Sequence, residues 1–205
     1  MIPSAKLKLR DRKKADILAA AIEEFRETGF AGARINRIAE RAHVSKRTLY
    51  KHYESKEALF YAIIDLTIAE HQTAGRIVYD AGVPIANQLK AALEAYFAKI
   101  SSDAYMTLSR ILIAEFLKDG EISDAILERF EGHNRGFAEL IGAAIADERL
   151  KPVDPDYAAT QLVALVKAFL FWPKFLMGEP LPSPEKVEAI IEDSIAMFLK
   201  HYARD

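Results

Sequence analysis

The 205-residue chain contains no cysteine, which excludes a disulfide framework, a thiolate zinc site, an iron–sulfur cluster and a cysteine nucleophile. It also lacks an uncharged apolar run of the roughly 18 residues that a membrane span requires. The basic segment 1–14 has no apolar core and therefore differs from a secretory signal. These absences predict a soluble cytoplasmic protein that is not associated with a membrane.

Residues that favour β-strands are also scarce, because valine and threonine together occur 13 times whereas alanine occurs 33 times. Alanine is the strongest helix former, and β-branched side chains favour strands. No segment alternates apolar and polar residues over a strand length, and apolar residues recur instead at helical spacing. Since 51% of the residues are hydrophobic, the chain can bury a core. The sequence predicts an all-α fold.

Capping residues and helix breakers divide the sequence into about nine helices. Gly29 is a candidate carboxyl-terminal cap for the first helix. Serine or aspartate precedes several of the others as a candidate amino-terminal cap, and two of these caps are followed by proline at the first helical position. The expected helices are 17–29, 35–42, 46–53, 56–79, 84–100, 103–119, 123–150 and two that begin at Pro155 and Pro184.

Charge is distributed unevenly along the chain although the total is a net charge of −2. Residues 1–58 hold 14 Lys and Arg against 8 Asp and Glu, a net charge of +6, and the remainder carries −8. Uneven surface charge is common by itself. A basic amino-terminal third on an acidic body nevertheless favours one surface that is built for a polyanion.

The three short helices of the basic third follow a helix-turn-helix pattern. At about 100° of rotation per residue, Arg47 and Lys51 lie opposite Leu49 in the third helix, if Leu49 faces the core. Thr48 and Tyr50 then lie on the flanks. Cations and hydroxyl groups are what meet phosphate oxygens and guanine edges in a major groove. A charged helix face is often merely solvated, but here the buried pattern, the turn length and the regional charge agree on a DNA-reading helix.

At this point the segment 17–64 resembles the amino-terminal domain of tetracycline-repressor (TetR) family transcription regulators. Its most specific part, VSKRTLYKHYESKEALF, is similar to the recognition helix and the start of the linker helix of that family. The resemblance implies a homodimer in which domain 1–55, with a basic amino-terminal arm, binds operator DNA and domain 56–205 dimerises and binds a small effector. The DNA-contact candidates, from the helix face and the resemblance together, are Arg34, Asn36, Lys46, Arg47, Thr48, Tyr50, Lys51, His52 and Lys56.

Several positions depart from the family pattern. Ala33-Arg34 replaces the Thr/Ser pair that usually caps the second helix, so we expect a less firmly started helix and a direct phosphate contact by Arg34. Asn36 stands where arginine is frequent and either reads adenine or faces solvent. His43 replaces a turn glycine, and a left-handed conformation costs histidine less than most residues. Arg47 stands where glycine is most frequent, which makes it the best candidate for guanine readout.

Two carboxyl-terminal helices carry apolar stripes that resemble the dimer-forming bundle of the family. The segments ILIAEF and AFLFWPKF resemble, more loosely, an AefR-type carboxyl-terminal domain. Because helix-turn-helix readers commonly bind two half-sites one DNA turn apart, we expect a homodimer; the alternative is that these stripes only close the core of one subunit. The predicted dimer residues are Leu162, Val166, Phe169, Val187, Ile191, Phe198 and Tyr202.

An effector pocket would combine aromatic side chains with a few placed polar groups. Lys167 is the most unusual residue, since it lies within LVALVKAFLF and buried lysine is rare unless it is paired. It either meets a carboxylate across the dimer or faces an acidic ligand, while core packing is the alternative for every candidate. The pocket candidates are Tyr96, Tyr105, Phe116, His133, Phe137, Lys167 and Trp172, with Glu115, Asn134 and Gln161 as further polar groups.

The leading hypothesis is a repressor that leaves operator DNA when a small-molecule effector binds. A DNA-binding regulator without an effector is the first alternative, and an all-α enzyme is the second. The five histidines are scattered, and the sequence has no glycine-rich phosphate loop and no His-x-x-x-His spacing. We therefore expect no catalytic residue, no metal site and no cofactor.

Overall fold

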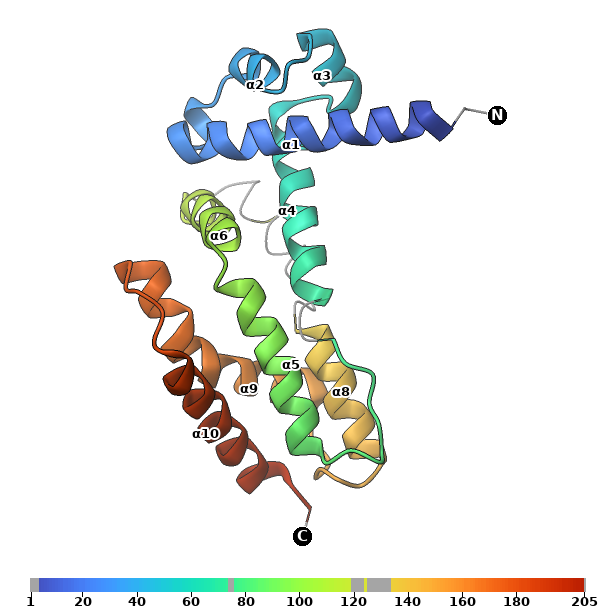
Figure 1. Cartoon of the computed structure of the whole chain (residues 1–205), viewed down its shortest axis with the longest axis vertical. Coiled ribbons are helices and arrows are strands. Elements are labelled where there is room, and N and C mark those ends of the chain that lie inside the picture. Colours follow the sequence, from blue (N-terminus) through green and yellow to red (C-terminus); the bar gives the residue numbers. More distant parts are fainter. Residues whose placement is uncertain (1–3, 74–75, 119–123, 125–133, 205) are drawn as a thin grey trace. The chain divides into compact units, whose positions relative to one another are not determined.

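The computed structural model describes residues 4–73, 76–118, 124 and 134–204. Over these residues the chain forms nine α-helices and one short π-helix, which confirms the all-α prediction (Figure 1). One isolated antiparallel bridge joins Leu150 to Ala203. The chain divides into two compact units. The amino-terminal unit comprises Met1–Thr67 and Thr107–Arg129, and the carboxyl-terminal unit comprises Ile68–Met106 and Phe130–Asp205.

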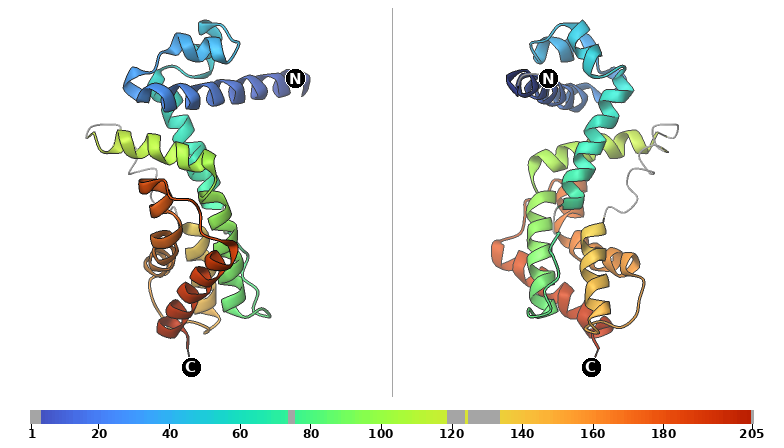
Figure 2. Two further views of the ribbon diagram at one scale, coloured as in Figure 1. Left: turned by 60° about the vertical axis from the view of Figure 1, so that its left-hand side comes forward. Right: turned by 90° about the vertical axis from the view of Figure 1, so that its right-hand side faces the viewer.

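The amino-terminal unit is built around α1 (Ser4–Gly32), α2 (Ile35–Arg41), α3 (Lys46–His52) and the first part of α4 (Lys56–Thr73). Figures 1 and 2 show α2 and α3 together on one side of α1. The core contains a cluster of three phenylalanine rings whose centroids lie 4.8–5.6 Å apart. Its most deeply buried residues include Ile17, Phe25, Ile38, Leu49, Leu59 and Phe60.

Helix α1 is longer than the sequence predicts, because it begins at Ser4 and not near Ile17. Residues 4–28 contain no glycine or proline and are rich in alanine, leucine, lysine and arginine, which are strong helix formers. The basic segment before Ile17 is therefore helical. At Gly29 the backbone leaves the helical region, with φ 68° and ψ 170°, as the predicted cap requires, and one further turn continues to Gly32.

The fourth helix ends earlier than predicted, since α4 is helical to Thr73 whereas residues 76–80 are not helical. The extended stretch is held from outside. Buried Gln88 accepts a hydrogen bond from the amide of Asp80 at 2.9 Å, and its own amide donates to the carbonyls of Asp80 and Val83 at 2.8 Å each. The hydroxyl of Tyr79 donates to Asp147 at 2.6 Å. These long-range contacts satisfy backbone groups that a continued helix would have used internally.

The carboxyl-terminal unit packs α5 (Ile85–Ile100), α8 (Arg135–Ala146), α9 (Pro155–Leu170), the π-helix η1 (Pro173–Met177) and α10 (Pro184–Tyr202) around an apolar core. The predicted caps are confirmed, because the Asp154 side chain accepts from the amide of Asp156 and the Ser183 side chain from the amide of Lys186. The fully buried core includes Leu89, Leu93, Tyr96, Phe137, Ile141, Leu162 and Val166.

Two predicted helices around the segment 107–150 are described only in part. α6 (Asp103–Phe116) begins where the sequence predicts, and α8 covers the later part of the predicted helix 123–150. Residues 125–133 of that prediction lie outside the described residues. The grouping of Thr107–Arg129 with the amino-terminal unit was not anticipated from the sequence, and the division into domains 1–55 and 56–205 stays a prediction.

The segment Pro155–Met177, formed by α9 and η1, is long and apolar enough to cross a membrane by length and composition alone. Its 23 residues reach a mean hydropathy of 1.3, although a third of the most apolar stretch is buried within the protein. Core helices pass the same test. The face of α9 that holds Leu162, Val166 and Leu170 belongs to the core of the carboxyl-terminal unit.

Candidate nucleic-acid interface

The start of α3 is formed by a tight turn and a serine cap. His43 adopts the predicted left-handed conformation, with φ 51°, and its amide donates to the carbonyl of Glu40 at 3.1 Å. The amide of Val44 then donates to the carbonyl of Ala39 at 3.0 Å, which fixes the turn to α2. Ser45 caps α3, because its hydroxyl accepts from the amide of Thr48 at 3.1 Å. This hydroxyl also lies 2.8 Å from the Thr48 hydroxyl.

The orientation of α3 agrees with the face that the sequence predicts. Leu49 is completely buried and seats the helix, whereas Arg47 and Lys51 are exposed on the opposite side. Tyr50 is 41% exposed, and the Lys46 ammonium lies 5.9 Å from the centre of its ring. Thr48 and His52 are half-buried on the flanks. The outer face of α3 thus presents cations and a phenol to solvent.

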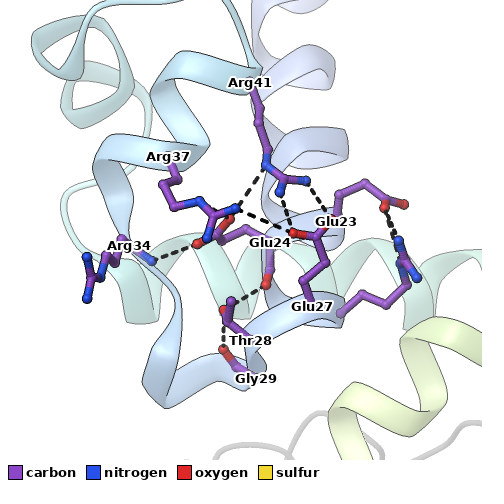
Figure 3. Close-up of polar contacts among 9 residues, drawn as sticks. Glu23, Glu24, Glu27, Thr28, Gly29, Arg34, Arg37 and Arg41 are labelled. Carbon is purple, nitrogen blue, oxygen red and sulfur yellow. Dashed lines mark hydrogen bonds and ion pairs between the residues drawn. The ribbon is translucent and has the colours of Figure 1, made fainter.

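The start of α2 differs from that of α3. Arg34 occupies the cap position with φ −117° and ψ 121°, and its side chain makes no capping hydrogen bond to the described helix. Its amide donates instead to a carboxylate oxygen of Glu24, on α1, at 3.3 Å (Figure 3). The side chains of Arg34 and Asn36 are exposed. The predicted absence of a local cap is confirmed, and a residue of another helix supplies the acceptor.

Two glutamates of α1 hold two arginines of α2 in one cluster (Figure 3). Glu24 is fully buried, and its Oε2 lies 3.4 Å from Nε of Arg37 and 3.5 Å from Nε of Arg41 as ion pairs. Arg41 also forms a two-pronged contact with the half-exposed Glu27. The hydrogen bond from Arg41 lowers the pKa of Glu27 and raises that of Arg41.

Sequence reasoning missed this cluster, although a signal was present. Glu24 falls on the same helical stripe as Ile17, Ala20 and Ala21, which is the stripe that α1 buries. A carboxylate on a buried stripe must be paired, because an isolated buried charge is strongly unfavourable. Arg37 and Arg41 are one helical turn apart and so present both guanidinium groups to one place.

Lys56 has contacts that its sequence position did not predict. Its ammonium donates to the carbonyls of Phe30 at 2.8 Å, Ala31 at 3.2 Å and Ala33 at 3.4 Å. It also lies 4.7 Å from the centre of the Phe30 ring. The ammonium is thus bound to the end of α1, whereas a contact between Lys56 and a DNA phosphate stays an untested prediction.

The predicted dimer residues require a correction. Leu162, Val166 and Ile191 are at most 1% exposed inside one subunit, so they are core residues and cannot cover a partner. Phe198 and Tyr202 are also nearly buried, at 3% and 8%, and Val187 is half-buried. Phe169 is different, because 59% of it is exposed. The inward stripe of each helix had been taken for its outward one.

A second stripe of α9 and α10 faces outward around Phe169. Tyr157 and Met197 are 57% and 61% exposed, and an open, mostly apolar groove of about 670 Å³ runs between the two helices. The groove is lined by Gln161, Ala164, Leu165, Ala168, Phe169, Met197, Phe198, His201 and Tyr202. Most of these residues were not named from the sequence, because alanines and a glutamine do not stand out as an apolar stripe.

The predicted pocket residues do not form one group. Tyr96 and Phe137 pack edge to face in the core, with ring centres 5.4 Å apart. Phe116 belongs to the amino-terminal unit, and His133 lies outside the described residues. Among the further polar groups, buried Glu115 pairs with Lys118 at 2.5 Å, Asn134 is buried, and Gln161 lies in the α9–α10 groove.

Tyr105, Lys167 and Trp172 meet around Phe171. The Lys167 ammonium lies 4.7 Å from the centre of the Phe171 ring and 5.7 Å from that of Trp172, and burial lowers its pKa. The Tyr105 ring lies 6.3 Å from that of Phe171. Aromatic faces attract a cation, so these rings compensate part of the burial of Lys167. Within the described residues, no group of three His, Cys, Asp or Glu side chains is arranged to hold a metal ion.

Comparison with known proteins assigns both parts of the chain. Residues 17–63 match the family described as bacterial regulatory proteins, tetR family. Residues 87–204 match the AefR-like transcriptional repressor, C-terminal domain. The second match alone covers more than half of the chain.

Individual relatives agree with this assignment. The transcriptional regulator RutR of Escherichia coli strain K12 is 31% identical over 153 residues, which are 71% of this chain and 68% of RutR. The transcriptional activator FasR of Mycolicibacterium smegmatis is 34% identical over 95 residues, but the match spans only 46% of this chain and 43% of FasR.

Solved structures show the same relationship over nearly the whole chain. A TetR family transcriptional regulator from Pseudomonas syringae pv. tomato has a TM-score of 0.83 and 34% identity, and the match covers 94% of this chain and 97% of that one. The flavonoid-responsive regulator FrrA has a TM-score of 0.79 and 27% identity, with 94% and 98% covered. The chain belongs to the TetR family of bacterial transcriptional regulators, with a helix-turn-helix DNA-binding domain and an AefR-like carboxyl-terminal domain.

Proposed function

We propose that this regulator binds operator DNA as a homodimer, that α3 of each subunit reads one half-site, and that a small-molecule effector bound in the carboxyl-terminal unit releases the DNA. The observation that carries the proposal is the α3 face, where Arg47 and Lys51 are exposed while Leu49 anchors the helix beneath them. A rigid helix with outward cations and an apolar anchor suits docking in a major groove.

Within this interface, phosphate contacts position the protein and base contacts specify the sequence. Arg47 is exposed at the centre of the face and can donate two hydrogen bonds to a guanine, so we assign it base readout. Lys46 and Lys51, exposed on either side of it, are assigned to phosphates. Arg34 and Asn36 are exposed at the start of α2, where they extend the same contact surface.

We assign the dimer contact to the outward stripe of α9 and α10 around Phe169 and Met197. Both side chains are more than half exposed, and they border a mostly apolar groove of about 670 Å³. Large exposed apolar patches mark interaction sites in proteins of this size. A second copy of the chain is the occupant that suits a reader of two half-sites, because a two-fold interface pairs one patch with itself.

We place the effector beside Lys167, Phe171 and Trp172. A cation next to aromatic rings, in a setting that lowers its pKa, is suited to an acidic or phenolic aromatic molecule. The relative FrrA is flavonoid-responsive by name, which shows that a protein of similar structure answers to an aromatic ligand. Release of DNA needs a coupling of only about 1–3 kcal/mol between the effector and operator sites.

Repression is proposed over activation because the carboxyl-terminal match is to a repressor domain, whereas the relative FasR is an activator. The proposed protein acts in the cytoplasm on the chromosome, does not span a membrane and catalyses no reaction. A regulator without an effector is the remaining alternative. It predicts that no ligand binds near Lys167.

Selection of bound fragments from random double-stranded DNA tests DNA reading and dimerisation together. The expected result is a palindrome whose half-sites lie one helical turn, about 34–36 Å, apart or a multiple of it. Retention of no sequence above the background would remove the proposal.

The selected operator then serves to test the effector. Calorimetric titration of candidate aromatic acids is carried out on the protein with and without operator. Because coupling is reciprocal, operator must weaken effector binding by the factor by which effector weakens operator binding. Equal effector affinity in both titrations would remove the ligand switch and leave DNA reading intact.

A further inference from the structure

The corner between α1 and α2, residues 29–34, determines how α2 is set against α1. Gly29 turns the chain with a positive φ of 68°, and the amide of Ala33 then donates to the carbonyls of Gly29 and Phe30 at 3.2 and 3.3 Å. Beyond these bonds the corner has carbonyls at the end of α1 and an amide at the start of α2 that no regular helix bond uses. Such groups need partners.

The carbonyl side of the corner is bound by one cation from another helix. Lys56, in the first turn of α4, donates to the carbonyls of Phe30, Ala31 and Ala33 at 2.8, 3.2 and 3.4 Å. An ammonium group has three donors, and here three acceptors surround it. The carbonyl end of a helix carries partial negative charge, which adds to the attraction.

The amide side of the corner is bound by one anion. Glu24 is completely buried, and its Oε1 accepts from the amide of Arg34 at 3.3 Å. Its Oε2 lies 3.4 Å from Arg37 and 3.5 Å from Arg41, both on α2 (Figure 3). The same carboxylate therefore meets the first amide of the α2 cap and two side chains of α2 itself.

We propose that Lys56 and Glu24 form a two-charge clamp on the α1–α2 corner, and that Lys56 serves operator binding as a positioning residue and not as a phosphate ligand. The inference rests on the proposed function, because its consequence is measured in DNA binding. Lys56 holds the carbonyls, Glu24 holds the amide and the arginines, and α2 cannot tilt without breaking both sets of contacts.

The clamp reaches the recognition helix through the α2–α3 turn. Bonds from the amides of His43 and Val44 to α2 carbonyls, at 3.1 and 3.0 Å, make this turn short and tight. Any tilt of α2 is thus passed on to α3. A misplaced α3 loses its fit to the groove, and the loss falls on specific binding more than on general attraction to DNA.

Counterion release distinguishes positioning from phosphate contact. Each lost phosphate contact changes the slope of log affinity against log salt by about 0.9. Operator affinity is measured across salt concentrations for the wild type, Lys56→Met and the matched control Lys51→Met. We expect Lys51→Met to reduce the slope by about 0.9. Lys56→Met should weaken operator binding about tenfold with less than half of that slope change.

Thermal unfolding of the free variants completes this experiment. Lys56→Met should lower the unfolding midpoint, and failure of this variant to fold without DNA supports the clamp as well, since folding does not require a phosphate ligand. The clamp is overturned if Lys56→Met unfolds like the wild type and reduces the salt slope as Lys51→Met does.

The anionic half is tested without DNA, so its result does not depend on the proposed function. Glu24→Gln keeps an acceptor for the Arg34 amide but removes the charge, and Glu23→Gln removes an exposed glutamate that pairs with Arg26 on the same helix. Hydrogen exchange at the Arg34 amide and the unfolding midpoint are measured for both. We expect Glu24→Gln to lower the midpoint by roughly 5 °C or more and to speed exchange, with Glu23→Gln near the wild type.

The double variant Glu24→Gln, Lys56→Met shows whether the two halves act as one device. A shared clamp predicts that the second substitution adds much less than it does alone, because the corner is already loose. Full additivity, or equal effects of Glu24→Gln and Glu23→Gln, would overturn the clamp. If the wild type bound no operator at all, the proposed function would fail while these measurements still tested the clamp.

Discussion

The face of α3 and the face of α9 and α10 were both predicted from helical periodicity, and they fared differently. α3 has seven residues with one buried anchor, Leu49, so that the opposite side has to be the exposed one. α9 and α10 have 16 and 19 residues and carry apolar side chains on two sides. Their core stripe, with Leu162 and Val166, was mistaken for the stripe that faces a partner. Periodicity finds an apolar stripe but does not say which neighbour covers it.

The largest effect is expected from charges placed on the outward stripe of α9 and α10. Phe169→Glu combined with Met197→Glu should convert the dimer to monomers, because two carboxylates per subunit would have to be buried. Operator affinity should fall about 1000-fold or more, since one half-site then binds without its tethered twin. Light scattering after size-exclusion chromatography measures the mass. Val78→Glu, at a 90% exposed site elsewhere, is the control, and an unchanged dimer would disprove the assignment.

The inward stripe should respond in the opposite way. Leu162→Ala removes a completely buried side chain, and we expect the free energy of unfolding to fall by about 2–5 kcal/mol. The mass in solution should stay that of the wild type below the unfolding transition. Denaturant unfolding together with light scattering checks both statements. Loss of the dimer in a folded Leu162→Ala variant would return this residue to the interface.

The reading face should be sensitive at one side chain. Arg47→Ala is expected to weaken operator binding by about 1–3 kcal/mol while changing binding to a scrambled duplex much less. Fluorescence anisotropy with both duplexes measures the ratio, and Lys186→Ala on α10 is the matched control for loss of one exposed cation. Equal losses on the two duplexes would assign Arg47 to phosphate and not to a base.

The local cap of α3 should contribute a smaller amount. Ser45→Ala removes the acceptor for the amide of Thr48, and such caps contribute typically about 1 kcal/mol. We expect the free energy of unfolding to fall by about this amount, and operator affinity to fall slightly as the first turn of α3 frays. Ser183→Ala removes the corresponding cap of α10 and should affect stability alone.

The smallest effect is a pH dependence at the edge of the clamp. Arg41 lowers the pKa of Glu27 from its ordinary value of 4.5, so this pair contributes stability above about pH 4.5 that is lost as the pH falls through the lowered value. Unfolding midpoints measured from pH 7 to pH 3 should fall more steeply for the wild type than for Glu27→Gln. Parallel curves would show that the exposed pair contributes nothing.

The recognition helix could be predicted in detail because its determinants are local. Ser45 and Thr48 are three residues apart, Leu49 sets the buried side by rotation alone, and His43 occupies a turn that the spacing of the two helices requires. The ties at its base could not be predicted. Lys56 and the carbonyls that it binds are 23–26 residues apart, and a lysine beside DNA looks the same in sequence whether its donors are free or used.

The sequence by itself determined the helical fold, most helix starts, the cationic face of α3 and the family. Each follows from propensity, capping or period, which act over a few residues. Only the tertiary structure decided which stripe of α9 and α10 faces inward, where Lys56 spends its charge and what pairs buried Glu24. The reason is that burial and long-range pairing depend on how helices pack, and a side chain's identity does not say which neighbour the packing brings to it.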